Sequence, residues 1–210
     1  DSSVSDIDYI SKDVCVIPHA SFGYYFHEIN NYEVNLKKCI GFFGRIEPYK
    51  GLDLLVTAFE NSSVNGIKLL IAGSGTIDND LLQKINNNRN IQLINRYIED
   101  SEFEGLLESV DFVVLPYKRA SQSGVIPMCF AAGKTVVATN VGALSEQVPE
   151  GTGVIVEPLS SSIKDSIDWF YVKSDKIFEY GKKAYQYARE EMSWNKSADL
   201  LMGFCKSIRR

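Results

Sequence analysis

Six short apolar runs alternate with stretches of helical periodicity along most of this chain, and this alternation restricts the possible folds more than any other feature. The runs are Lys38–Phe43, Lys68–Ala72, Ile91–Ile94, Asp111–Leu115, Thr135–Ala138 and Val154–Val156. Several are continuously apolar, which is typical of strands covered on both faces. Strands that alternate with helices through short loops form parallel sheets. We therefore expect an α/β fold, with a Rossmann-like open parallel β-sheet of about six strands and helices on both faces.

Helical periodicity fills the intervals between these runs. The first four predicted helices are Leu52–Phe59, Asp80–Asn86, Ser101–Val110 and Gly124–Ala132. Beyond residue 159 the pattern predicts three more, from the stripe Ile163, Ile167 and Phe170, the run Ser174–Met192 and the run Trp194–Ile208. Ser101 and Glu104 have the spacing of a capping box, so we expect the third helix to begin there. We place a seventh apolar run, Val14–Ile17, outside the main sheet.

Composition excludes several classes of function. The 210 residues carry a net charge of −5 and no dense basic cluster, so we expect no nucleic-acid partner. No run approaches the roughly 18 apolar residues of a membrane span, so we expect no transmembrane segment. The four cysteines form no Cys-x-x-Cys pair, which favours free thiols in the cytoplasm. With His19 and His27 as the only histidines, we expect no metal site.

The loop after the first predicted strand brings two cations to the start of a helix. It runs Gly44-Arg45-Ile46-Glu47-Pro48-Tyr49-Lys50-Gly51. Backbone N–H groups at a helix start attract anions, and Arg45 and Lys50 add full positive charges there. An arginine binds two phosphate oxygens at once, while a lysine acts as a mobile point charge. The loop thus predicts a polyphosphate site, although an ordinary turn with two hydrated cations fits the same residues.

Two further loops reach the same edge of the expected sheet. The glycines of Gly73-Ser74-Gly75 let the backbone approach a ligand closely, and a plain tight turn is the alternative. After the third strand, Arg96, Tyr97 and Ile98 provide backbone groups and a ring that could hold a nucleobase. The alternative packs Tyr97 on the core and turns Arg96 to water.

The fourth loop, Pro116–Val125, leads into the fourth predicted helix. Ser123 is a favourable N-cap, and Pro127 falls near the first turn, where its missing N–H costs least. A second helix start would then face the crevice that holds the two cations. Together they suit a diphosphate without a metal ion. A serine-capped helix that binds nothing remains the alternative.

Taken in order, these segments resemble the donor-binding half of the retaining glycosyltransferases of family 4, the group 1 glycosyl transferases with the GT-B fold. The matching segments are Gly44–Gly51, Ala72–Gly75, Asp111–Pro116, Ala132–Thr139 and Val141–Gly142. The resemblance extends from about Val16 to Trp194. It implies the C-terminal half of a GT-B enzyme, consistent with a chain that starts at Asp1 without Met or a signal peptide and is expected to be cut from a longer protein.

The resemblance also divides the chain. It implies a linker and the start of the domain at 1–36, and a nucleotide-sugar-binding Rossmann-like domain at 37–192. Residues 193–210 would form a helix that crosses back toward an N-terminal domain. That missing domain would hold a glycan or lipid-linked acceptor, and through it the enzyme would associate peripherally with a membrane.

The chemistry that the resemblance implies is transfer of a hexose from a nucleotide diphosphate sugar to an acceptor hydroxyl, with retention of configuration, in polysaccharide biosynthesis. The donor would be a UDP-sugar, the commonest in the family, with guanine as the alternative base. Arg45 and Lys50 would be catalytic, because they would stabilise the departing diphosphate. The implied donor-binding residues are Gly44, Gly73, Gly75, Arg96, Tyr97, Ile98, Ser121, Gln122, Ser123, Gly124 and Val125. We expect no cofactor, and no activity from this domain without its N-terminal half.

The chain departs from the family pattern in the fourth loop. The family carries two glutamates there, eight positions apart, and these positions fall on Ala120 and Met128. The chain instead resembles a subgroup with the motif Ser-Gln-Ser-Gly-Val-Ile at 121–126. The missing glutamates keep open a non-catalytic nucleotide-sugar-binding module. A GT-B nucleotide-sugar epimerase would need carboxylates and a histidine in the crevice, and the chain supplies few of either. A dehydrogenase would need a Gly-x-Gly-x-x-Gly turn after the first strand, which the sequence lacks.

Overall fold

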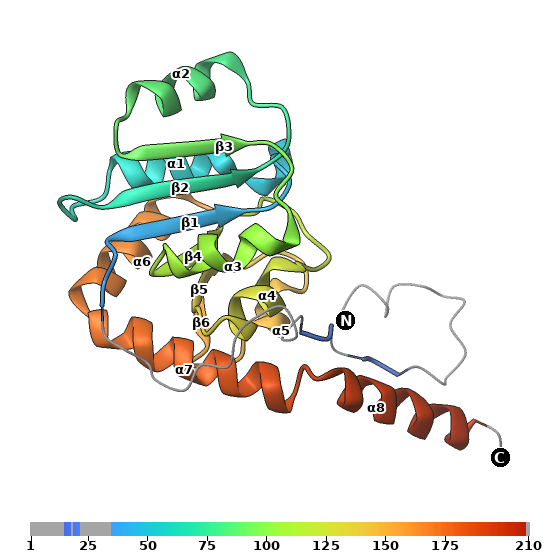
Figure 1. Ribbon diagram of the computed structural model, residues 1–210. Coiled ribbons are helices and arrows are strands. Elements are labelled where there is room, and N and C mark those ends of the chain that lie inside the picture. The colour runs from blue at the N-terminus through green and yellow to red at the C-terminus, as the bar shows by residue number, and fades with distance from the viewer. Residues whose placement is uncertain (1–14, 18, 22–34, 209–210) are drawn as a thin grey trace.

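The computed structural model describes residues 15–17, 19–21 and 35–208, and within them six strands form one parallel sheet in the order β3-β2-β1-β4-β5-β6 (Figure 1). The strands are β1 Cys39–Phe43, β2 Lys68–Gly73, β3 Ile91–Asn95, β4 Phe112–Leu115, β5 Val136–Thr139 and β6 Gly153–Val156. Every strand lies within one residue of its predicted bounds at each end. The predicted six-stranded Rossmann-like sheet is confirmed.

Helices connect all of these strands and form the C-terminal part. They are η2 Pro48–Lys50, α1 Leu52–Glu60, α2 Asn79–Asn87, α3 Asp100–Glu108, α4 Val125–Ala131, α5 Leu144–Gln147, α6 Ser160–Val172, α7 Ser174–Glu190 and α8 Trp194–Ser207. The sequence pattern predicts neither η2 nor α5, because helices of three and four residues are too short to show a periodicity.

Alternate residues of the strands face two separate apolar cores. On one face Phe42 of β1 and Phe112 of β4 pack with α1, α2 and α6. On the other face Phe43 and Leu115 pack with α3, α4, α5 and the later part of α7. The four central strands, β2, β1, β4 and β5, are almost entirely buried, which explains why their sequences are largely apolar.

The predicted capping box at Ser101 and Glu104 is wrong by two residues. The helix α3 begins at Asp100 with Glu99 as its N-cap. The Glu102 carboxylate accepts a hydrogen bond from the backbone N–H of Glu99 (3.1 Å). The same carboxylate binds Arg96, and this ion pair from the preceding loop selects the earlier of the two possible boxes.

A buried carboxylate fastens the opposite edge of the sheet. Asp111, just before β4, accepts hydrogen bonds from the backbone N–H groups of Lys37 (2.7 Å) and Cys39 (3.0 Å). The Tyr171 hydroxyl of α6 donates a third (2.8 Å). Burial, with the Asp111 charge, raises the pKa of Tyr171. These bonds join the starts of β1 and β4, the two strands between which the strand order reverses.

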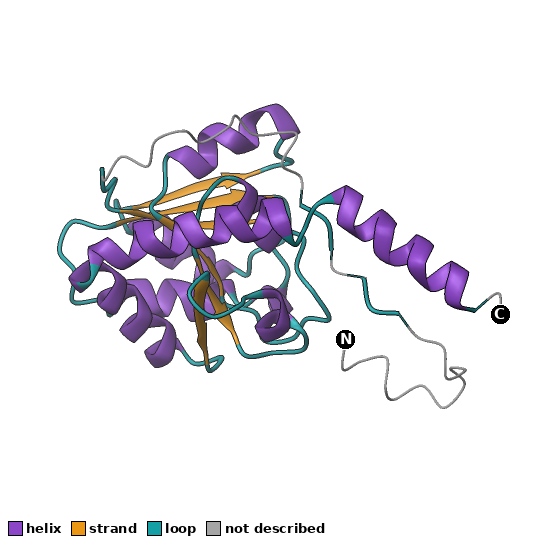
Figure 2. Cartoon of the chain, turned by 90° about the horizontal axis from the view of Figure 1, so that it is seen from below, coloured by secondary structure: helices purple, strands orange, loops and turns teal. Residues whose placement is uncertain are grey.

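The last helix stands apart from the sheet and its covering helices. Figure 2 shows α8 continuing beyond the end of α7 and away from the sheet, and no residue of α8 is buried. Ser21 donates a backbone hydrogen bond to Met192 at the junction (2.6 Å). Residues 15–17 are in no strand, whereas Val14 and His27, with the predictions about the first residues, lie outside the described residues.

Candidate functional site

The loops after β1 and β2 pack against each other at the carboxyl edge of the sheet, to which the arrowheads of these strands point in Figure 1. Ile46 donates a backbone hydrogen bond to Ser74 (2.9 Å). A Cβ at Gly73, where φ is +154°, would overlap the carbonyl of Gly44, and one at Gly75 would overlap that of Ile46. The paired glycines thus provide the close approach of one loop to another.

The loop after β1 also packs against the loop after β4. Lys118 donates a backbone hydrogen bond to Tyr49 (2.8 Å), and its ammonium pairs with Asp53 of α1 (2.8 Å). A Cβ at Gly51 would overlap the carbonyl of Pro116. These contacts flank the carboxyl ends of β1 and β4, where the sheet order reverses and beyond which open α/β sheets bind their ligands.

Arg45 and Lys50 are two neighbouring cations whose charges no acid offsets in the part of the chain that the structure describes. Arg45 is exposed and forms no hydrogen bond or ion pair with any residue that the structure describes. The Lys50 Nζ lies 3.7 Å from the centroid of the Tyr117 ring and 5.3 Å from that of Tyr49. Burial, assisted by the charge of Arg45, lowers the pKa of Lys50 to about 8. Such a pair is suited to bind an anion, which would relieve both the burial cost and the repulsion.

The start of α4 adjoins these cations. The Ser123 hydroxyl accepts a hydrogen bond from the Val125 N–H (3.3 Å). The N-cap position of α4 is Gly124, one residue later than the predicted N-cap Ser123. The Ser123 hydroxyl also shares a hydrogen bond with the Tyr117 hydroxyl (3.1 Å). The Cγ2 of Val125 lies 3.6 Å from the position that a Cβ on Gly44 would take. Tyr117 therefore connects Lys50 to the beginning of α4.

Ser123 makes its hydrogen bonds within the protein. Its backbone N–H donates to Oε1 of Gln147 in α5 (2.8 Å), and its carbonyl accepts from Nε2 of the same residue (3.3 Å). The Ser123 side chain is buried, whereas Ser121, Gln122 and Gly124 are exposed. Of the predicted residues in this loop, these three present surface to a ligand, while Ser123 shapes the loop.

The loop after β3 matches neither prediction completely, that is, neither base binding by Arg96, Tyr97 and Ile98 nor a Tyr97 packed on the core with Arg96 facing water. Arg96 forms a two-pronged ion pair with Glu102 (2.6 and 2.8 Å) and donates to the carbonyl of Tyr97 (2.9 Å). The Tyr97 ring is 66% exposed, so the alternative that packs it on the core is wrong. Ile98 packs against the core below α3. An exposed ring in a loop whose arginine is paired with Glu102 is suited to stacking on a base.

Three side chains that build the site escape sequence reasoning. Tyr117 has the one available signal, an aromatic ring directly after a buried strand in a cationic loop. Gln147 lies 24 residues beyond Ser123. Asn95 accepts from the N–H of Gly75 (3.2 Å) and donates to its carbonyl (3.1 Å). Only the folded sheet brings these partners together.

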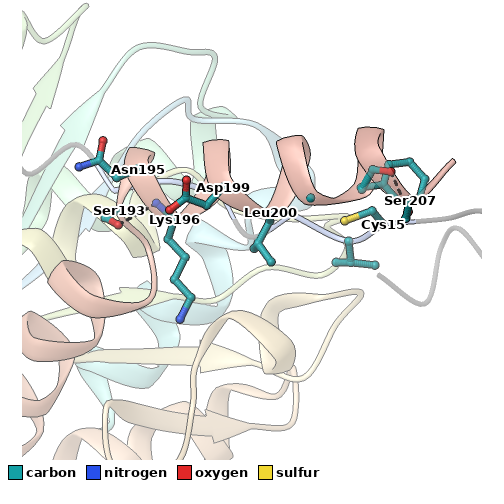
Figure 3. Close-up of a pocket in the computed structure, with 10 residues that line it drawn as sticks. Cys15, Ser193, Asn195, Lys196, Asp199, Leu200 and Ser207 are labelled. Carbon is teal, nitrogen blue, oxygen red and sulfur yellow. Dashed lines mark hydrogen bonds between the residues drawn. The ribbon is translucent and has the colours of Figure 1, made fainter. Parts of the chain in front are cut away.

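Two cavities border the C-terminal helices. One, of about 860 Å³, lies between α8 and residues 15–16 and is lined by Lys196, Asp199 and Leu200 (Figure 3). The other, of about 160 Å³, touches the site at Gln122 and Gln147 and extends to Ile17 and Met192. In the described ranges, no group of three or more His, Cys, Asp or Glu side chains could hold a metal ion. No helix there is both long and apolar enough to cross a membrane.

Comparison with known proteins connects this geometry to a family. The family model for glycosyl transferases group 1 matches residues 37–171. A D-inositol 3-phosphate glycosyltransferase of Corynebacterium glutamicum is 25% identical over 173 residues, covering 77% of this chain and 41% of that protein. The chain thus spans less than half of that relative's length.

Solved structures share the fold. The C-terminal domain of a group 1 glycosyl transferase, LpcC of Francisella tularensis, matches with a TM-score of 0.66 and 23% identity, covering 74% of this chain and 86% of that one. Anabaena HepE, solved with UDP and glucose, matches with a TM-score of 0.70 and 19% identity, covering 84% of this chain and 49% of that one. From the extent of the family match, the chain belongs to the group 1 glycosyltransferases, and its fold is that of their C-terminal GT-B domain.

Proposed function

We propose that this chain is the donor-binding domain of a retaining hexosyltransferase whose donor is a nucleotide diphosphate sugar. The observation that carries the proposal is the pair Arg45 and Lys50, two cations without a carboxylate partner among the described residues, at the point where the strand order reverses. A diphosphate supplies the negative charge that this position lacks.

The two cations would act on the leaving group. When the bond between the anomeric carbon and the diphosphate breaks, negative charge grows on the phosphate oxygens. Arg45 would bind two of these oxygens, and Lys50 would approach as a point charge from the ring of Tyr117. Cations held in place before the reaction stabilise such charge most effectively.

Retention requires the acceptor oxygen to bond to the anomeric carbon on the face that the diphosphate leaves. The leaving diphosphate would itself take the proton of the acceptor hydroxyl. No carboxylate of the chain is needed as the base in that step, which suits a fourth loop with Ala120 and Met128 in place of glutamates. The two cations would also take the part that a metal ion plays in other transferases.

We infer that the nucleotide is UDP. Support comes from the structural match to HepE, which was solved with UDP and glucose. In this chain the exposed ring of Tyr97 and the backbone of Ile98 lie in the loop after β3, beside the glycine pair that follows β2. The base would stack on Tyr97 and hydrogen bond to backbone groups of Ile98.

We further infer that the acceptor is a glycan or lipid-linked hydroxyl held by a separate N-terminal half, which would also bring the enzyme to a membrane surface for polysaccharide synthesis. The curated relatives are more than twice as long as the matched part of this chain. Residues 193–210 would cross to that half, because α8 buries none of its own residues. The four free thiols fit a cytoplasmic location.

Calorimetric titration of the chain with UDP, GDP and UDP-glucose tests the proposal. We expect UDP to bind, and Arg45→Ala and Lys50→Ala each to weaken its binding about tenfold or more, as for a lost charge-assisted hydrogen bond. Arg89→Ala is the matched control, because Arg89 is exposed in the turn before β3, at the opposite edge of the sheet. Equal affinity in all four proteins would eliminate the phosphate site.

A non-catalytic nucleotide-sugar-binding module is the second candidate, favoured by Ala120 and Met128. Both candidates bind UDP-glucose, so the distinguishing measurement is slow hydrolysis of UDP-glucose by the protein that includes the N-terminal half. Hydrolysis that is lost in Lys50→Ala supports the transferase. Binding without any hydrolysis supports the module.

A further inference from the structure

Tyr117 contacts the loop after β1, the segment before α4 and the end of β5. It is among the largest fully buried side chains. Its ring supports the Lys50 ammonium, its hydroxyl is bonded to Ser123, and its carbonyl accepts the Thr139 hydroxyl at the end of β5 (2.6 Å). A residue held at its backbone and at the tip of its ring cannot turn away from Lys50.

The face of a tyrosine ring attracts an ammonium because the π system is electron-rich. At 3.7 Å from the centroid, Nζ of Lys50 lies well inside the range of this attraction, and Tyr49 offers a second, more distant ring. Burial raises the pKa of Tyr117, so its hydroxyl stays protonated and the hydrogen bond to Ser123 persists over the range in which Lys50 titrates. The uncharged Tyr117 ring thus provides a surface against which the Lys50 ammonium packs.

We propose that Tyr117 is a positioning residue for nucleotide diphosphate binding, which holds the Lys50 ammonium beside Arg45 and ties it to the start of α4. The proposal rests on the proposed function of the same crevice. Without the ring, an ammonium on four methylenes would move away from the like charge of Arg45 and into water. Contact with the Tyr117 ring keeps the Lys50 ammonium close enough to Arg45 for one diphosphate to bind both cations.

The lowered pKa of Lys50 also makes donor binding sensitive to pH. Of the residues that the structure describes, those that face Lys50 are Arg45, Tyr49 and Tyr117, and the nearby Lys118 is already paired with Asp53. With no acid among them, free Lys50 loses its proton near pH 8. A bound diphosphate favours the ammonium, so binding above pH 8 takes up a proton and weakens as the pH rises.

A series of ring substitutions separates this role from simple packing. Tyr117→Phe keeps the ring and removes the hydroxyl, and phenylalanines with one, two and three ring fluorines at position 117 keep the shape while making the face less electron-rich. In the free chain, NMR of labelled lysines should show the pKa of Lys50 falling stepwise with fluorination. The matched control is the same series at Tyr180, whose ring faces Lys176 and Lys183 (both 5.9 Å).

Calorimetry with UDP at pH 7 is the second measurement. Three ring fluorines at position 117 should weaken UDP binding about fivefold relative to Phe, a typical cation–π effect, and the series at Tyr180 should leave the affinity unchanged. A Lys50 titration and a UDP affinity that do not respond to fluorination at position 117 would overturn the proposal. If UDP binds none of the proteins, the proposed function fails, while the NMR titration still decides whether the ring holds Lys50.

Discussion

Lys50 illustrates, at the scale of one residue, how a proposed binding group costs stability. Its ammonium is half buried beside Arg45, and the surroundings that the structure describes offer it aromatic rings and no carboxylate. The ordinary pKa of 10.5 falls to about 8 in the folded chain. The unfolded chain therefore holds more protons at this residue between these two values, so stability rises with pH across that range.

Replacement of this residue separates stability from function. We expect Lys50→Met to raise the melting temperature at pH 7, where the buried charge is fully present, and to abolish UDP binding. The gain should shrink as the pH rises from about 8 to 10.5, because wild-type Lys50 is then neutral in the folded chain. Thermal unfolding at pH 7 and pH 10 measures the gain in melting temperature and its decrease with pH, and calorimetry measures UDP binding. A variant less stable than wild type at pH 7 would contradict the burial cost.

At the scale of elements, glycines determine how closely the loops of the crevice approach one another. A side chain at Gly73 would overlap the carbonyl of Gly44. Backbone is the partner at this contact, so no rotamer change can relieve the overlap. The crevice therefore depends on the positions of whole loops, and a defect after β2 should reach the cations after β1.

We expect Gly73→Ala to destabilise the chain by about 2–4 kcal/mol and to weaken UDP binding, through strain and displacement of the loop after β1. Gly105→Ala is the control, because Gly105 lies inside α3 and a Cβ there meets nothing within 4 Å. It should stabilise the chain by about 0.5–1 kcal/mol. Urea unfolding measures both variants. A harmless Gly73→Ala would show that the approach of the two loops is not tight.

The elements themselves could be predicted from sequence because burial on both faces makes the strands apolar throughout, a signal that local sequence carries. The carboxyl-edge loops followed from the parallel topology. Sequence reasoning missed contacts between distant segments, such as Gln147 with Ser123 and Tyr117 with Lys50. It also placed the capping box of α3 two residues too late, because it did not anticipate the local ion pair between Arg96 and Glu102.

At the scale of the whole molecule, the C-terminal helix is the element least supported by the rest. Its apolar side chains Trp194, Leu201 and Met202 are each about half exposed. A cavity of about 860 Å³ lies between this helix and residues 15–16. This arrangement suits a helix that packs on a second domain, as we propose for residues 193–210.

Hydrogen exchange provides a test on the isolated chain. Backbone amides of α8 should exchange far faster than those of α7, because α7 buries Ala184 and Ala188 in the core and α8 buries nothing. The contrast should diminish in the protein that includes the N-terminal half. Equal protection of α7 and α8 in the isolated chain would mean that α8 needs no further partner.

The central claim is that the diphosphate of a nucleotide lies between Arg45 and Lys50, beyond the carboxyl ends of β1 and β4. A crystal structure of the chain with UDP tests it most directly. We expect the guanidinium of Arg45 and the ammonium of Lys50 each within hydrogen-bonding distance of phosphate oxygens, at about 2.7–3.0 Å. Phosphates bound elsewhere, such as in the cavity beside α8, with both cations left facing water, would contradict it.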